Sequence, residues 1–148
     1  MPDLPITGGC MCERVRFRVT KPMLGAAYCH CKRCQRRTGT AFSTSALTVP
    51  GSFEVTEGEE LLGVHKPQDP PGWHKYFCSR CGSQIYTQSH EDPNLVSVRM
   101  GALDEDPGVR PGLHQFVAYK APWDELPDDG LPRFDERMPA ARYQGEQE

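Results

Sequence analysis

The stretch Cys29-His30-Cys31-Lys32-Arg33-Cys34 decides how the chain folds, because it places three cysteines within six positions. Two further stretches have similarly dense spacing, Cys10-Met11-Cys12 and Cys78-Ser79-Arg80-Cys81. Spacings of one or two residues let several sulfur atoms reach one point, as metal sites in proteins require. Cysteine is also often buried, but burial alone gives thiols no reason to occur at such spacings. The pattern therefore predicts metal ligands rather than buried free thiols.

The seven cysteines do not fit a disulfide framework, because an odd number cannot all be paired. Residues Met1–Gly9 contain Asp3 and two prolines, with neither a basic segment nor an apolar run, so they do not resemble a signal peptide. The longest uncharged stretch, Thr38–Phe53, is too short and too polar to span a membrane. We therefore expect a cytoplasmic protein, in a compartment where thiols stay reduced.

The length and composition limit both the fold and the partners. A chain of 148 residues is one ordinary domain on length alone. The 14 glycines and 14 prolines exclude a long-helix or coiled-coil protein and favour short strands joined by turns. The formal net charge of −3 argues against general binding of nucleic acid or of a membrane surface.

An all-β domain of short antiparallel strands with one short helix is the predicted fold. Residues 14–20 alternate Val15, Phe17 and Val19 with basic residues, as in a half-buried strand. The predicted helix runs from Lys32 to Thr38 and is stopped by Gly39. We expect one domain over residues 1–134 and a polar, frayed tail over residues 135–148. The other predicted strands are 26–30, 41–49, 52–56, 75–77, 83–88, 95–100 and 114–120.

The seven cysteines divide naturally into a set of four and a set of three. Residues at positions i and i+2 of a strand share a face, so Cys10 and Cys12 can point together and close a four-sulfur site with Cys78 and Cys81. Closed four-ligand zinc sites are structural, whereas three protein ligands leave a position for water or substrate, as at catalytic zinc. The set Cys29, Cys31 and Cys34 would have that open position unless a His, Asp or Glu elsewhere fills it.

At this point the chain resembles a known family, the glutathione-dependent formaldehyde-activating enzymes, which include centromere protein V. The resemblance runs from about Gly8 to Trp123, nearly the whole chain. Weaker matches are Gly101-x-Leu103-Asp104, His114 and Pro122-Trp123. The main motifs are Gly8-Gly9-Cys10-x-Cys12, Cys29-His30-Cys31-x-x-Cys34-Gln35-Arg36-x-x-Gly39 and Phe77-Cys78-x-x-Cys81-Gly82.

The resemblance implies a β-tent-like fold, two zinc ions per chain and carbon–sulfur lyase activity. It assigns a catalytic zinc to Cys29, Cys31 and Cys34, and a structural zinc to Cys10, Cys12, Cys78 and Cys81. It also names glutathione as the small-molecule thiol substrate and formaldehyde as its carbonyl partner. The chain departs from the family at Glu13, where relatives usually have glycine after the second cysteine.

Basic residues surround the set of three cysteines. Lys32, Arg33, Arg36 and Arg37 could meet the carboxylates of a glutathione-like substrate, since arginine binds carboxylates in bidentate fashion. They could equally be solvated charges that offset a thiolate-rich site. A proton carrier is not identified, although His30, Asp104 and His114 are candidates by residue type.

Two classes of function remain open from the sequence. The first is a zinc-dependent carbon–sulfur lyase that acts on a thiol–aldehyde adduct such as S-hydroxymethylglutathione. The second is a non-catalytic zinc-binding module that binds another protein, which would need an occupied fourth position or an exposed apolar patch. The sequence does not indicate an oligomeric state.

Overall fold

The computed structural model describes residues 2–68 and 72–138, and the chain divides into two compact units. Unit 1 comprises the described residues of Met1–Leu24 and Ala46–Val109. Unit 2 comprises those of Gly25–Ser45 and Arg110–Glu148. Each unit is therefore assembled from two segments that are separated in the sequence.

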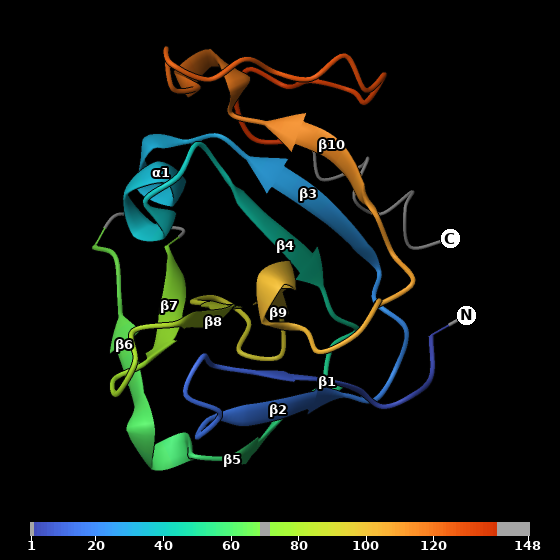
Figure 1. Ribbon diagram of the computed structural model, residues 1–148, viewed down its shortest axis with the longest axis vertical. Helices are drawn as coiled ribbons and strands as arrows, with labels where there is room; N and C mark the ends of the chain where they lie inside the picture. Colours follow the sequence, from blue (N-terminus) through green and yellow to red (C-terminus); the bar gives the residue numbers. More distant parts are fainter. Residues whose placement is uncertain (1, 69–71, 139–148) are drawn as a thin grey trace. The chain divides into compact units, whose positions relative to one another are not determined.

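Unit 1 contains a three-stranded sheet in the order β1-β2-β5, drawn in blue and green in Figure 1. Its strands are β1 (Ile6–Gly9), β2 (Arg16–Val19) and β5 (Phe53–Glu57), and both pairs of neighbours are antiparallel. The alternating residues Phe17 and Val19 are 1% and 0% exposed, so one face of β2 lies in the core.

Unit 1 also contains four antiparallel strands in the order β9-β8-β7-β6. Tyr76 of β7 and Tyr86 of β8 lie opposite each other and stack with ring centroids 4.5 Å apart. The strands are β6 (Leu62–His65), β7 (Trp73–Cys78), β8 (Gln84–Ser89) and β9 (Val96–Arg99), with the 3-10 helices η1 (Glu59–Leu61) and η2 (Met100–Ala102).

Unit 2 contains the order β10-β3-β4 and the helix α1. Strands β3 and β10 lie side by side in Figure 1 and are parallel, with His114 opposite Tyr28 and Gln115 opposite Cys29. The elements are β3 (Gly25–Cys29), α1 (Lys32–Thr38), β4 (Ser43–Leu47, of which the first three residues belong to this unit), β10 (Pro111–Gln115) and the 3-10 helix η3 (Val117–Tyr119).

The helix α1 has a defined cap at each end. Cys31 is its N-cap, and the Cys31 sulfur accepts a hydrogen bond from the backbone N–H of Cys34 at 3.3 Å. Gly39 ends the helix in the left-handed conformation, with φ of 69°, and its N–H donates to the carbonyl of Gln35. The predicted helix is thus confirmed with the predicted bounds.

The prediction of a mostly β protein with one short helix is confirmed, and the differences lie in individual strands. Strands β1 and β6 were not predicted, because the glycines Gly8, Gly9 and Gly63 hide their apolar alternation. The strand predicted over residues 114–120 is wrong beyond Gln115: Phe116 has φ of 58°, and η3 follows. The pair β3–β10 is parallel, not antiparallel.

The last described residues belong to unit 2. The predicted polar tail over 135–148 falls mostly on residues 139–148, which lie outside the described residues. Before them, the Tyr119 hydroxyl donates to Glu136 at 2.7 Å, and Met138 is 6% exposed. Among the described residues, no helix has the length and apolarity needed to cross a membrane.

Candidate metal centres

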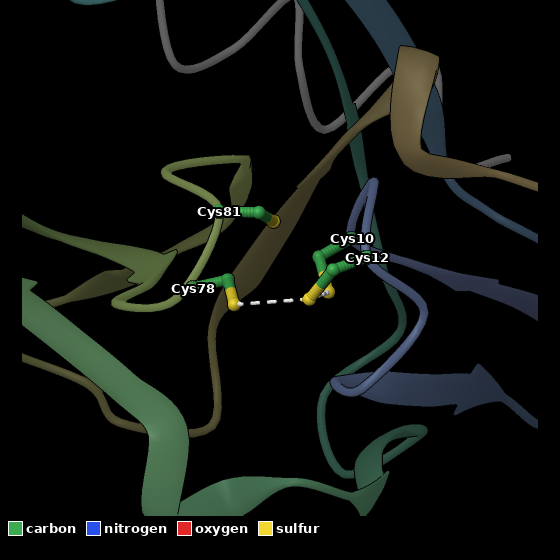
Figure 2. Close-up of side chains that lie close together, drawn as sticks. All are labelled: Cys10, Cys12, Cys78 and Cys81. Carbon is green, nitrogen blue, oxygen red and sulfur yellow. Dashed lines mark hydrogen bonds between the residues drawn. The ribbon is translucent and has the colours of Figure 1, made fainter.

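Four cysteines of unit 1 form the first candidate metal centre, called here the four-cysteine cluster (Figure 2). Cys10 and Cys12 follow β1, Cys78 ends β7, and Cys81 lies in the turn before β8. The sulfur atoms of Cys10 and Cys12 are 3.5 Å apart, and those of Cys12 and Cys78 are 3.8 Å apart. All four sulfur atoms lie within 4.8 Å of one another.

These distances fit a tetrahedral zinc ion. A zinc–sulfur bond of 2.3 Å at each corner of a tetrahedron places neighbouring sulfur atoms about 3.8 Å apart. Cys10 and Cys78 are 5% and 0% exposed, so the cluster is closed on at least one side by protein. Four converging thiols with this spacing therefore suit a structural zinc site.

Two tight turns bring the four sulfur atoms together. The N–H of Gly82 donates to the carbonyl of Cys78 at 2.7 Å, and Gly82 has φ of 80°, which favours glycine. In the other turn, the Glu13 N–H donates to the carbonyl of Cys10 at 3.0 Å, and Glu13 has φ of 64°. The position where the family usually has glycine is thus a left-handed one, held here by glutamate.

The turn after β7 also lowers the pKa of one thiol of the four-cysteine cluster. The Ser83 hydroxyl lies 3.3 Å from the Cys81 sulfur and lowers the pKa of this thiol to about 5. A thiol with a lowered pKa is ionised at neutral pH, the form in which cysteine binds a metal.

Three cysteines of unit 2 form the second candidate metal centre, called here the three-cysteine cluster. Cys29 is the last residue of β3, Cys31 is the N-cap of α1, and Cys34 lies in the first turn of that helix. Their sulfur atoms lie within 4.8 Å of one another, and all three residues are partly exposed. Within the described part of the chain, no His, Asp, Glu or further Cys joins this group.

The sulfur atoms of this cluster are held by local hydrogen bonds. The buried Ser43 hydroxyl of β4 donates to the Cys34 sulfur at 3.0 Å, a contact that the sequence analysis missed. The neighbouring sulfur atoms of Cys31 and Cys34, with burial, raise the pKa of the Cys29 thiol. Crowded thiols of this kind resist ionisation until a cation offsets their charge, so the donor set suits a divalent metal ion.

A hydrogen-bonded chain of two histidines and a carboxylate begins at His30, which lies between Cys29 and Cys31 in the sequence. The Nε2 atom of His30 is 2.8 Å from Nδ1 of His114, and the Nε2 atom of His114 is 2.7 Å from the carboxylate of Asp129. Burial, followed by the nearby His114, lowers the pKa of His30. The hydrogen bond from His114 lowers the pKa of Asp129. We call these three residues the histidine chain.

The three candidate proton carriers, His30, Asp104 and His114, do not all belong to the same group of interacting residues. His30 and His114 belong to the histidine chain, whereas Asp104 lies in unit 1 and forms an ion pair with Arg16. Thr7 also donates to the Asp104 carboxylate, at 2.7 Å. Asp129, which completes the histidine chain, was missed, because an exposed loop carboxylate has no local signal in the sequence.

The basic residues expected near the substrate all lie on α1. Arg33 and Arg36 are exposed and Arg37 is partly buried. Arg37 is three positions after Cys34, so the two share a side of the helix. Lys32 donates instead to the Gln35 side chain at 3.0 Å.

Comparisons with known proteins agree with this architecture. The model of the family described as "Glutathione-dependent formaldehyde-activating enzyme" matches residues 5–119. A protein of Halomonas elongata, named by inference as a glutathione-dependent formaldehyde-activating enzyme, is 28% identical over 127 residues, which are 82% of this chain and 80% of that protein. The crystal structure of a Rhodobacter sphaeroides protein superposes with a TM-score of 0.58 over 86% of this chain and 99% of that one, at 21% identity. This last likeness supports the fold.

Proposed function

We propose, on the premise that this chain belongs to the glutathione-dependent formaldehyde-activating enzyme family, that it is a zinc-dependent carbon–sulfur lyase. Its substrate class would be a thiol–aldehyde adduct such as S-hydroxymethylglutathione. The observation that carries the proposal is the contrast between a cluster of four sulfur ligands and a cluster of three. Three protein ligands leave room for a substrate, whereas four do not.

The donor set of the three-cysteine cluster favours a sulfur substrate. The chemistry that zinc supplies in such a site is an open position for a soft ligand and the deprotonation of a thiol at neutral pH. Cys29, Cys31 and Cys34 would hold the metal from one side, and Ser43 supports Cys34 through its hydroxyl.

The reaction itself needs no oxidant or reductant. A thiol and an aldehyde form an S-hydroxymethyl adduct when the sulfur–carbon bond forms and the thiol proton passes to the aldehyde oxygen. The reverse reaction breaks the same bond. The two carboxylates of a glutathione-like thiol would meet Arg33, Arg36 or Arg37, which stand on the helix that supplies Cys34.

The seven free cysteines support a reducing location. None of them is part of a disulfide. A protein that keeps two thiol clusters available for metal is suited to the cytoplasm, where thiols remain reduced. We propose this location for the protein, and a metal-binding domain that extends over residues 1–134.

One observation favours a second function, that of a non-catalytic zinc module. Tyr119 and Trp123 of unit 2 are 49% and 70% exposed, and exposed aromatic residues are common in protein-binding surfaces. Such a module would bind zinc at both clusters but would not alter the reaction of a thiol with an aldehyde.

Exchange NMR of formaldehyde with glutathione distinguishes the two functions. We expect zinc-loaded protein to accelerate the exchange between free and adduct formaldehyde, and the Cys34→Ser variant to lose the acceleration. The control is Asp128→Ala, which removes an exposed carboxylate and leaves all seven cysteines in place without adding a thiol. Equal exchange with and without fully loaded protein would contradict the proposed lyase.

A further inference from the structure

We propose that His114 and Asp129 are positioning residues of the three-cysteine cluster, acting through His30, which stands between two of its ligands in the sequence. The proposal rests on the proposed function only in that it requires zinc at this cluster. It assigns the C-terminal segment of unit 2 a role in holding metal, although none of that segment's described residues, 110–138, belongs to either cysteine cluster.

The direction of the hydrogen bonds in the histidine chain is set by the carboxylate of Asp129 at one end of it. An ionised carboxylate only accepts hydrogen bonds, so Nε2 of His114 donates to Asp129 over 2.7 Å. In the neutral ring, Nδ1 of His114 then accepts from Nε2 of His30 over 2.8 Å. The carboxylate therefore sets the tautomer of both rings, as carboxylates do behind histidines at metal sites.

The backbone of His30 is held as firmly as its ring. Its N–H donates to the carbonyl of Gln115 at 3.0 Å, and its carbonyl accepts from the side chain of the buried Gln35 at 2.9 Å. The same Gln35 nitrogen donates to the carbonyl of Tyr119 at 2.9 Å. The peptide group between Cys29 and His30 is therefore hydrogen-bonded to β10. The peptide group between His30 and Cys31 is linked through the Gln35 side chain to η3.

Packing completes the restraint on the two rings. His30 and His114 are 1% and 2% exposed. Tyr28 stacks on His114 with centroids 4.7 Å apart, and Phe42 lies against His30 with centroids 5.5 Å apart. The bond to His114 and the packing against Phe42 restrict the rotation of the His30 ring, and through the backbone this restraint extends to Cys29 and Cys31.

A purely space-filling role explains these contacts less well. Buried polar rings add no stability over apolar residues of the same size, because each must replace its bonds to water. What the hydrogen bonds from His30 to His114 and from His114 to Asp129 add is a single geometry, although Nδ1 of His30, at the inner end of the chain, has no hydrogen-bond partner among the described residues. A site with three ligands gains from this, since it lacks the fourth ligand that would otherwise fix the positions of the other three.

Zinc release from the intact, zinc-loaded chain tests the proposal. We would follow transfer of zinc to a coloured chelator in excess, and we expect two phases, one for each cluster, because the clusters differ in their number of ligands. In His114→Gln, the glutamine amide reaches about as far as Nε2 and keeps a partner for Asp129, but the bond to His30 is lost. Asp129→Ala removes the other end of the chain. The matched control is Asp128→Ala, which removes the neighbouring exposed carboxylate with the same change in charge.

The expected result is about tenfold faster release of one zinc ion in His114→Gln and in Asp129→Ala, at the low end of the effects of supporting residues on metal affinity. The second zinc ion, at the four-cysteine cluster, should leave at the wild-type rate and so reports that the variant is folded. Asp128→Ala should match the wild type at both sites.

The outcomes separate this proposal from the proposed function. Release from both variants at the rate of Asp128→Ala would overturn the inference alone, and so would equal acceleration at both clusters, since that indicates a general loss of stability. A wild-type chain that binds only one zinc ion under saturating conditions would overturn the proposed function and this inference with it. If His114→Gln does not fold, Asp129→Ala decides, because the side chain that it removes is 26% exposed and the only ring nitrogen in the described part of the chain that loses its carboxylate partner is Nε2 of His114.

Discussion

The sulfur atoms of Cys12 and Cys78 lie 3.8 Å apart, although 66 positions of sequence separate the two residues. The four-cysteine cluster therefore joins the start of unit 1 to the end of β7. The three-cysteine cluster has a different character, because its three cysteines lie within one short stretch of chain. This contrast in chain topology leads to different expectations for the two clusters.

The Cys78→Ser variant should be strongly destabilised. Zinc at a structural site contributes its binding free energy to folding, about 10–16 kcal/mol in isolated zinc-finger peptides, so loss of even a part of it is severe. A loss of about 3 kcal/mol would lower the melting temperature by roughly 6–12 °C in a chain of this size. Thermal melts followed by circular dichroism, with zinc measured on the same samples, check this. An unchanged melting temperature would exclude a structural role for the four-cysteine cluster.

The Cys34→Ser variant should keep its fold and lose one zinc ion. The three-cysteine cluster closes only a short loop, so breaking it releases little chain entropy. We expect the zinc content to fall from two ions to one and the melting temperature to fall less than in Cys78→Ser. If Cys34→Ser unfolds as readily as Cys78→Ser, both clusters are structural and the zinc-module function is favoured.

The Arg36→Gln variant should weaken the binding of thiols that carry carboxylates. Arg36 is an exposed residue in the last turn of α1, and a guanidinium–carboxylate contact across a solvated surface contributes about 1 kcal/mol, or roughly a fivefold change in affinity. The apparent KM for glutathione should rise by that factor, while the KM for 2-mercaptoethanol, which has no carboxylate, should stay the same.

The matched control for Arg36→Gln is Arg18→Gln. Arg18 pairs with Glu54 in unit 1 at 2.8 Å, so its replacement changes the net charge equally but leaves α1 intact. Equal effects of the two variants would show that the net charge of the protein, rather than α1, attracts the substrate.

The Asp104→Asn variant should lose stability in a manner that depends on pH. Hydrogen bonds from Arg16 and then from Thr7 lower the pKa of Asp104, so the folded state favours the ionised form. This stabilisation is complete above the pKa of an unfolded aspartate, about 3.9, and is lost as the pH falls through the lower pKa of the folded state. At pH 7 the variant should be less stable than the wild type by up to about 1 kcal/mol, and the difference should shrink below pH 4.

Urea unfolding of wild type and Asp104→Asn at matched pH values measures that difference. Comparison at the same pH removes the loss of zinc in acid, which both proteins share. The control is Glu105→Gln, the adjacent exposed carboxylate. A difference between Asp104→Asn and wild type that is constant from pH 7 to pH 3 would contradict the role of the ionised pair.

Much of the fold and both cysteine clusters were predictable, because their signals are local. The spacing of Cys29, Cys31 and Cys34 predicts a shared site, and a helix stopped by Gly39 predicts the bounds of α1. The division into four and three follows from the spacing of the cysteines along the chain, and the structure brings together the same groups. Their proposed roles await the measurements above.

The features that could not be predicted depend on pairing between distant segments. Nothing near His114 indicates that its ring meets His30, because that contact arises from the parallel alignment of β3 and β10. The pairing of Asp129 is even harder to predict, because the sequence around a loop carboxylate does not indicate whether that carboxylate is solvated or hydrogen-bonded. Glu13 shows the reverse case: the family's usual glycine at this position pointed to a special backbone, and the structure shows the positive φ.

The two-segment construction of unit 2 has a consequence for the order in which a ribosome makes the protein. The three cysteines of its cluster are all synthesised by residue 34, but His114 and Asp129 follow 80 and 95 residues later. During that interval, the nascent chain exposes three thiols that lack the restraint of the finished protein. If the histidine chain has the role proposed above, zinc captured early would be exchangeable, and would become firmly held only when β10 pairs with β3 and Asp129 bonds to His114.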